Sequence, residues 1–541
     1  MRGGIVRIGL VSALPVLFLS AQTQPPAHQK SALEGQVVNS ATAEPLRKAH
    51  LTLRRVDASG GEIGSSPAGA SVISAVTDAQ GKFAFAGLEA GRYELIGRHD
   101  GFVEQQYGAR RRYRPGTPIS LMAGEQKRDI VMRLAPFGSV SGRMVDEDGD
   151  PIPYVQVILM ALQYTSKGRQ LIPNQSGSTN DLGEYRIFGV NPDRYYLKAS
   201  PPNTVRIGDF DGESYVTAYY PGVPDALSAA PLDIGPGQQL RGIDMALRQR
   251  RPLSIRGRAI KPAGAASMTL VLSTSDAAGT STSMGVGIRD PDGKFQLQGV
   301  APGAYSLIVR TSVDNKPYSA RVPIQVGSTD IEGIELHLAP AVDLTGQVRI
   351  EGKTEAKPAT VFLGLEGQDS SAGADVKEDG RFGFYELGPD VYKVSVRPPE
   401  GLYLKSVRWG DADISDSGLD LSAGAAAGEL VITLSANGGE IDGSVESDQS
   451  EPAASTTVTL VPAVSQAHFK MTTTDAQGHF RIRGIAPGSY KLFAWDDVNV
   501  SAVEYDPEFL KAFESMGQSV EISENAKEDI HLKLIRTPAE Q

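Results

Sequence analysis

One short segment occurs five times in this chain of 541 residues, and the repetition constrains the fold more than any other feature. Each copy begins with a glycine and has Phe or Tyr two positions later. Apolar residues follow at the fourth and seventh positions, and a tyrosine at the twelfth. The copies are Gly81–Tyr93, Gly183–Tyr195, Gly293–Tyr305, Gly380–Tyr392 and Gly478–Tyr490. Successive copies lie 102, 110, 87 and 98 residues apart, whereas solenoid repeats span about 20–50 residues. Each unit is long enough to bury its own core, which predicts a tandem array of domains.

The residues of each copy predict two β-strands joined by tight turns. In four copies an Asp or Asn lies three positions before the glycine, where it caps a turn that the glycine closes with positive φ. Apolar and polar residues then alternate, as in a strand with one buried face. A second turn precedes the tyrosine, an arrangement that resembles the tyrosine corner of β-sandwiches. The expected turn residues are Gly81, Gly183, Gly293, Gly380 and Gly478, and the expected corner residues are Tyr93, Tyr195, Tyr305, Tyr392 and Tyr490.

A second marker opens each unit, and an alternating apolar run closes it. The marker is Gly-x-[Val/Met/Ala], at Gly35, Gly142, Gly257, Gly346 and Gly443. About seven short strands per unit predict an all-β chain, a tandem array of five antiparallel seven-stranded β-sandwiches of transthyretin-like or immunoglobulin-like type. The expected domains are repeat 1 (32–136), repeat 2 (137–250), repeat 3 (251–340), repeat 4 (341–435) and repeat 5 (436–541).

Repeat 5 contains the clearest helical pattern of the chain. Asp506 is a good N-cap residue and Pro507 suits the first helical position, which predicts a short inserted helix near 506–516. Phe509 and Phe513 lie on one face of this helix. They either cover a sheet edge or present an apolar surface to a partner.

The N-terminus has the layout of a secretory signal peptide. Arg2 and Arg7 precede an apolar run from Ile8 to Leu19, which is shorter than the about 20 residues of a transmembrane helix. We expect a signal peptide at 1–21 and a disordered linker at 22–31, with an uncleaved membrane anchor as the alternative. No later stretch reaches membrane-spanning length. The expected destination is the periplasm, the cell surface or the medium.

Composition excludes several classes of protein. Lys and Arg number 53 against 64 Asp and Glu, and this net charge of −11 argues against a nucleic-acid partner. The absence of cysteine excludes disulfides, thiolate metal sites and cysteine nucleophiles. The seven histidines form no closely spaced pair with Glu, as a zinc peptidase would need. We therefore expect no enzyme, no cofactor and no catalytic or metal-binding residues.

Two acidic stretches leave calcium binding open as an alternative. Asp146–Asp150 forms an acidic loop, but Val157 occupies the position of the bidentate Glu of an EF-hand. A second stretch contains Asp411, Asp413, Asp416 and Asp420. A solvated turn is the simpler interpretation of both.

The repeated pattern resembles a known family. Asp-x-x-Gly-x-Phe, followed after a short gap by Pro-Gly-x-Tyr-x-[Leu/Val], is similar to the carboxypeptidase regulatory-like domain, across nearly the whole chain after the signal peptide. The resemblance implies a transthyretin-like β-sandwich, related to Cna-B-type modules, without catalytic residues of its own. Repeat 4 departs from the pattern, because Lys377 replaces the acidic turn residue and Glu386 replaces a glycine. These two changes put the turn geometry of that repeat in doubt.

Few residues suggest a ligand. The candidate binding residues are the flat rings of Trp409 and Trp495, which suit sugar stacking, and the cationic loop Arg110, Arg111 and Arg112, which suits phosphate or carboxylate groups. Burial in the core and ordinary solvation are the alternatives. The tyrosine pairs 195–196 and 219–220 are further candidates for stacking. We expect an exported, non-catalytic protein that binds polysaccharide or another envelope component. The alternative is a structural spacer or a protein-interaction array at the cell surface.

Overall fold

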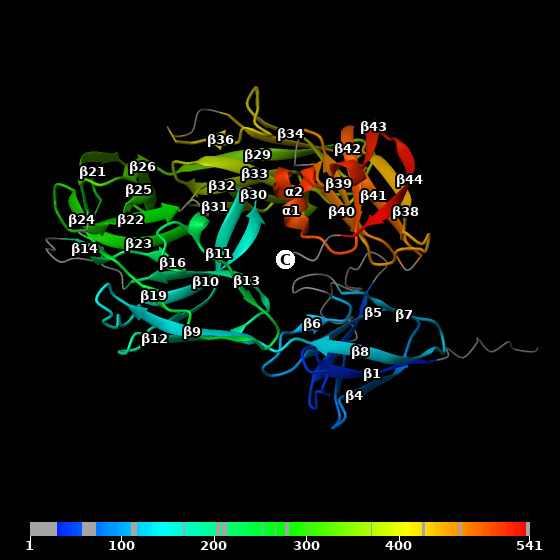
Figure 1. Ribbon diagram of the computed structural model, residues 1–541. Helices are drawn as coiled ribbons and strands as arrows, with labels where there is room; N and C mark the ends of the chain where they lie inside the picture. Colours follow the sequence, from blue (N-terminus) through cyan, green and yellow to red (C-terminus); the bar gives the residue numbers. More distant parts are fainter. Residues whose placement is uncertain are drawn as a thin grey trace, which may run out of the picture. The chain divides into compact units, whose positions relative to one another are not determined.

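The computed structural model describes residues 30–56, 72–109, 116–165, 168–201, 206–207, 214–250, 253–265, 267–275, 281–300, 302–368, 370–422, 424, 428–464, 468–475 and 477–536. Nearly all of the described chain with regular structure is β-strand (Figure 1), which confirms the expected all-β class. The chain divides into two compact units. The first comprises residues 1–39, 43–100 and 104–134, and the second comprises residues 40–42, 101–103 and 135–541. The boundaries of repeats 2 to 5 within the second unit stay a prediction.

In repeat 1 the opening strand lies between two partners in one sheet. Strand β1 (Ser31–Asn39) pairs antiparallel with β4 (Lys82–Leu88) and parallel with β8 (Gln126–Leu134). The second sheet is built on the antiparallel pair of β2 (His50–Val56) and β5 (Gly91–Arg98). Its remaining strands are β3 (Ile73–Val76), β6 (Gln105–Gln106) and β7 (Ile119–Leu121).

Repeats 2 to 5 place their opening strands in the same way. These strands are β9 (Gly138–Val145), β21 (Leu253–Ile260), β29 (Val342–Glu351) and β38 (Gly439–Glu446). Their antiparallel partners are β12 (Glu184–Val190), β24 (Lys294–Val300), β32 (Arg381–Leu387) and β41 (His479–Ile485). Their parallel partners are β18 (Gln239–Leu240) with β19 (Met245–Ala246), β27 (Ile331–His337), β37 (Leu430–Ser435) and β44 (Lys527–Ile535).

The remaining strands form the second layer of each repeat or extend the first. Repeat 2 has β10 (Gln156–Thr165), β11 (Gly168–Ser178), β13 (Asp193–Ser200), β16 (Ala218–Tyr219) and β17 (Leu232–Ile234). Repeat 3 has β22 (Met268–Ser275), β23 (Ser281–Ile288), β25 (Gly303–Val313), β26 (Lys316–Val326) and β28 (Ala339–Pro340). Repeat 4 has β30 (Phe362–Glu366), β31 (Ser371–Ala374), β33 (Val391–Arg397), β34 (Tyr403–Trp409), β35 (Ala412–Asp413) and β36 (Leu419–Asp420). Repeat 5 has β39 (Thr457–Pro462), β40 (Lys470–Thr473), β42 (Gly488–Trp495) and β43 (Gln518–Ile522), and there a parallel pair of β42 with β44 joins both layers into one seven-stranded sheet.

Short elements complete the described chain. Strand β14 (Arg206–Ile207) pairs with β24, and β15 (Ser214–Tyr215) pairs with β20 (Gln249–Arg250). The 3₁₀ turns η1 (Ala226–Ser228) and η2 (Pro358–Thr360) lie in loops. No described helix is long and apolar enough to cross a membrane.

The tandem β-sandwich fold is confirmed, but its opening and closing strands pair parallel and not antiparallel. In repeat 1 these are β1 and β8, and they run in the same direction. Parallel neighbours need a long crossover connection. Here the crossover comprises the strands of the second layer together with β4, the antiparallel partner of β1 in the first sheet.

The marker glycine of the opening strand is explained by this pairing. A Cβ atom on Gly257 would lie 2.5 Å from the carbonyl oxygen of Ile334 on the parallel strand and 2.6 Å from Cζ of Phe295. Neither neighbour has free space to move into, because one is backbone and the other is a core ring. The corresponding glycines of repeats 1, 4 and 5 approach a carbonyl of the closing strand in the same way, and in repeat 2 Gly142 approaches the carbonyl of Ile243, which lies between β18 and β19.

The apolar positions of the repeated segment form the cores. In all five copies, no side chain at the second, fourth or seventh position is more than 5% exposed. The turn glycines before them have φ between 70° and 83°, the region that favours glycine. In repeat 1, Oδ1 of Asp78 accepts hydrogen bonds from the backbone N–H groups of Gln80 and Lys82, at 2.9 and 2.8 Å.

Repeat 4 keeps this turn geometry despite its two sequence departures. Gly380 has φ 83°, and Asp379 takes over the capping role by accepting from the N–H of Arg381 at 3.0 Å. Glu386 has φ 58°, where the other repeats have a glycine with positive φ, and its N–H donates to Oδ1 of Asp343 at 2.9 Å. This hydrogen bond to the Asp343 carboxylate helps to hold a backbone conformation that a non-glycine residue rarely adopts.

Candidate functional site

Trp495 is a core residue, which corrects its assignment as a candidate sugar-stacking ring. Its side chain is 0% exposed, and its Nε1–H donates to Oγ1 of Thr459 at 2.9 Å. One face of the indole stacks on Phe493, with ring centroids 5.3 Å apart, and Phe513 meets it edge-on at 5.1 Å. No face of this ring is open to a ligand.

The inserted helical segment explains why Trp495 is buried. It consists of α1 (Val500–Tyr505), α2 (Pro507–Lys511) and the 3₁₀ turn η4 (Glu514–Met516). Asp506 caps α2 by accepting from the N–H of Glu508 at 3.1 Å. Phe509 and Phe513 of this segment pack in one cluster with Trp495. The two phenylalanines thus cover the tryptophan of their own repeat.

The other ligand candidates of the sequence have different locations. Trp409 is half-buried at the end of β34, and Gly428 leaves room for one side of its ring. Tyr195 and Tyr219 are buried in apolar clusters, so stacking by these two rings is excluded. Arg110, Arg111 and Arg112 lie outside the described residues. Their part in binding stays a prediction, as does that of Trp409.

The carboxylates of the two acidic stretches form hydrogen bonds with the backbone of their own loops. Oδ1 of Asp146 accepts from the N–H groups of Asp148 and Asp150, at 3.0 and 2.8 Å. Oδ1 of Asp413 accepts from the N–H of Ser415 at 3.0 Å. Within the described ranges, no group of three or more His, Cys, Asp or Glu residues is arranged to hold a metal ion.

Among the described residues, the repeat tyrosines of repeats 1, 2, 4 and 5 make the same hydrogen bond. Each hydroxyl donates to the backbone carbonyl four residues earlier: Tyr93 to Glu89 at 2.9 Å, Tyr195 to Asn191 at 3.0 Å, Tyr392 to Gly388 at 3.0 Å, and Tyr490 to Ala486 at 2.7 Å. This geometry defines a tyrosine corner, which fixes the turn that precedes the strand. Burial, together with the nearby Tyr403, raises the pKa of Tyr490 to about 12.

We expect repeat 5 to lose stability as the pH rises from about 10 to about 12. The unfolded chain releases the Tyr490 proton near pH 10, whereas the folded repeat retains it to about 12, so ionisation favours unfolding in this window. Ultraviolet absorbance of the phenolate, recorded during alkaline unfolding, measures the effect. In Tyr490→Phe the alkaline loss should shrink, and the stability at neutral pH should fall by about 1 kcal/mol with the lost hydrogen bond. An unchanged alkaline profile in this variant would contradict the assignment.

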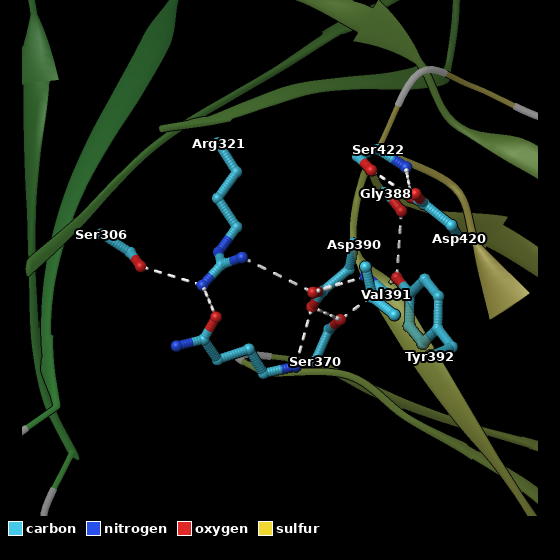
Figure 2. A network of polar contacts seen from close by, with 10 residues as sticks. Ser306, Arg321, Ser370, Gly388, Asp390, Val391, Tyr392, Asp420 and Ser422 are labelled. Atoms are coloured by element: carbon cyan, nitrogen blue, oxygen red, sulfur yellow. Dashed lines mark hydrogen bonds and ion pairs between the residues drawn. The ribbon is translucent and has the colours of Figure 1, made fainter. Parts of the chain in front are cut away.

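A buried polar network joins repeats 3 and 4 (Figure 2). Arg321 of β26 reaches the loops around β33, where its guanidinium lies 3.6 Å from the carboxylate of Asp390. The same guanidinium donates to Oγ of Ser306 at 2.9 Å and to Oε1 of Gln368. The side chains of Arg321 and Asp390 are only 17% and 5% exposed. This pair is largely removed from water.

Asp390 is also satisfied from its own repeat. Its two oxygens accept from the N–H groups of Gln368 and Val391, at 2.9 and 2.8 Å. Ser370 lies between this carboxylate and the hydroxyl of Tyr392, so the network continues into the tyrosine corner of repeat 4 (Figure 2). Arg321 and Asp390 could not be identified from the sequence, because no local pattern marks a pair that forms between two repeats.

A second candidate surface lies on the outward face of repeat 2. On β12, the side chains of Glu184, Arg186 and Phe188 point outward, and the register sets them opposite Arg143, Ser141 and Ser139 of β9. Phe188 is 76% exposed. An open depression of about 510 Å³ lies on these strands, lined by Arg143, Glu184, Arg186 and Asp244 among others.

The sequence did contain a signal for this surface. Phe188 occupies the fifth position after the turn glycine, an outward position at which repeats 1, 3 and 5 have Ala86, Gln298 and Arg483. Repeat 4 has another aromatic there, Tyr385, which is 67% exposed. An aromatic residue at an outward position departs from the alternation of apolar and polar residues along the strand. This departure is visible in the sequence alone.

The fold defines this chain as a tandem β-sandwich protein. The family model of the carboxypeptidase regulatory-like domain matches residues 32–133 and 440–533. The resemblance inferred from the repeated pattern is therefore confirmed for these two segments, which lie in repeats 1 and 5. None of the curated proteins compared with the chain matches it.

Among solved structures, the chain is similar to several bacterial pilins. The minor pilin GBS52 of Streptococcus agalactiae is 14% identical, with 41% of this chain and 96% of that chain covered and a TM-score of 0.23. A streptococcal ancillary pilin is 13% identical, with 58% and 100% covered and a TM-score of 0.21. The shaft pilin SpaA of Lactobacillus rhamnosus GG is 11% identical, with 41% and 98% covered and a TM-score of 0.19. These TM-scores are too low to carry a functional conclusion.

Proposed function

We propose that this chain is an exported, non-catalytic protein that binds polysaccharide of the cell envelope through the outward face of β9 and β12. The observation that carries the proposal is the exposed ring of Phe188 on the strand face whose Glu184 and Arg186 line a polar depression. The N-terminal pattern of Arg2, Arg7 and the apolar run supports export.

The chemistry of this surface suits a sugar. The apolar C–H face of a pyranose packs on an aromatic ring, and its hydroxyl groups need both donors and acceptors close by. Arg186 supplies donors two residues from Phe188 on the same strand face, while Glu184 and Asp244 supply acceptors. The N–H of Arg143 already holds Asp244 in place, at 2.7 Å from Oδ1.

Replacing Phe188 by alanine should weaken glycan binding by about tenfold, because the ring surface is lost while the sheet stays intact. The full chain is first screened on an array of plant, fungal and bacterial glycans, and the best ligand is then titrated by calorimetry. Phe362→Ala is the matched control, since that phenylalanine is 73% exposed on β30 of another repeat. Equal affinity of the Phe188 variant and the wild type would overturn the proposed site.

A structural array that holds partners at the cell surface is the second candidate. It is favoured by the Arg321–Asp390 pair, because a buried contact between repeats 3 and 4 restricts their relative motion. Crosslinking on intact cells, before and after removal of surface polysaccharide, separates the two candidates. An array protein should retain the same crosslinked protein partners after the treatment, whereas a polysaccharide-binding protein should be released.

A further inference from the structure

The inserted segment α1–α2 of repeat 5 has a second packing partner, besides the sheet of its own repeat. Val503 is 1% exposed and belongs to the Trp495 cluster, so one side of the segment faces its own core. Helix α1 is also in contact with β10 of repeat 2.

The contact is centred on an ion pair between residues 337 positions apart. Arg169 of β11 donates from Nε and Nη2 to Oδ2 of Asp506, at 3.1 and 2.8 Å. The ring of Tyr164, opposite Arg169 in the hairpin, lies 5.8 Å below the guanidinium. The hydrogen bond to Asp506 is the main cause of a raised pKa of Arg169.

Burial makes this pair different from the many exposed ion pairs of the chain. The Asp506 side chain is only 8% exposed, although that of Arg169 is 58% exposed. A carboxylate that is held away from water needs its charge compensated. Asp506 thus has two roles: Oδ1 caps α2, and Oδ2 binds the hairpin.

We infer that the α1–α2 insertion is an interaction surface whose partner is the β10–β11 hairpin of the same chain. The Arg169–Asp506 pair connects repeat 2 to repeat 5. The polypeptide between these two residues therefore forms a loop whose ends are held together by the pair. Loss of the pair opens the connection and leaves the individual sandwiches folded. This inference is independent of the proposed polysaccharide site.

The absence of cysteine allows a direct test by distance measurement. Cysteines introduced at the exposed positions Gln163 on β10 and Ser515 in η4 carry the only two spin labels of the full chain. Double electron–electron resonance should give a single narrow distance distribution for the otherwise unchanged protein. In Asp506→Asn the distribution should move to longer distances and become at least about twofold broader.

The choice of asparagine separates the contact from the fold of the helix. Asparagine is as good an N-cap as aspartate, so α2 is retained while the charge is lost. Glu508→Gln is the matched control, because Glu508 lies on the same helix and pairs with Lys511 at 2.6 Å. It should leave the distribution unchanged. Arg169→Glu, which reverses the charge in the hairpin, should open the contact as well.

Two results would overturn the inference. The first is an unchanged narrow distribution in both Asp506→Asn and Arg169→Glu. The second is a short distance that disappears when labelled chains are diluted with unlabelled ones, because the hairpin would then bind a second copy. Persistence of the distance on dilution, together with its loss in the two variants, would support the intramolecular contact.

Discussion

Replacing Gly257 by alanine should destabilise repeat 3 by about 3 kcal/mol, a large effect for the addition of one methyl group. The new Cβ would lie 2.5 Å from the carbonyl oxygen of Ile334 and 2.6 Å from Cζ of Phe295. Relief requires either a wider separation of the parallel strands β21 and β27 or a displaced core ring. Both changes disturb contacts that the rest of the sandwich depends on.

Hydrogen exchange measures this loss of stability within repeat 3, when it is followed by mass spectrometry on peptides of residues 253–337. A loss of about 3 kcal/mol corresponds to about a hundredfold loss of protection in the strands of repeat 3. Gly287→Ala is the control in the same repeat, since no heavy atom lies within 4 Å of its Cβ position and its φ is not positive. Similar behaviour of the two variants would show that the close approach at Gly257 is not what requires glycine.

Replacing Arg321 by methionine should destabilise the junction of repeats 3 and 4 by about 2 kcal/mol. The change leaves the Asp390 carboxylate 5% exposed and without its cation. We expect less than the full cost of an isolated buried charge, because the N–H groups of Gln368 and Val391 still donate to it. Methionine preserves most of the apolar stem, so the loss reports mainly on the charge.

A double-mutant cycle separates the pair from its surroundings. The variant Arg321→Met/Asp390→Asn should be less destabilised than the sum of the two single variants, because neither charge remains without its partner. Arg256→Met is the matched control. Its pair with Glu332, at 2.7 Å, is 47% and 64% exposed, so its loss should cost at most about 0.5 kcal/mol. Strict additivity in the Arg321–Asp390 cycle would show that the two side chains act independently.

Local chemistry explains how much of the fold was predictable. A turn such as Asp78–Gly81 is specified by residues within hydrogen-bonding reach of one another along the chain. The same holds for the N-cap at Asp506 and for the tyrosine corners, in which donor and acceptor are four residues apart. Such patterns can be identified in the sequence because tertiary structure adds little to them.

The candidate sites were less predictable, because they depend on which faces the fold leaves open. Trp495 and Phe188 are both aromatic residues of β-strands, yet one is 0% and the other 76% exposed. The difference arises from Phe509 and Phe513, which cover Trp495 from an insertion later in the chain. None of the described residues of repeat 2 covers Phe188 in this way.

The sequence by itself determined the repeated unit, its turns, its buried positions and its resemblance to the carboxypeptidase regulatory-like domain, since these rest on short-range spacing and on the period of a strand. Only the tertiary structure decided the parallel pairing of opening and closing strands, which in turn requires the marker glycines. It also decided the pairs Arg321–Asp390 and Arg169–Asp506. In each pair the two residues come from different repeats. The sequence does not indicate which of many complementary charges, far apart along the chain, will form an ion pair.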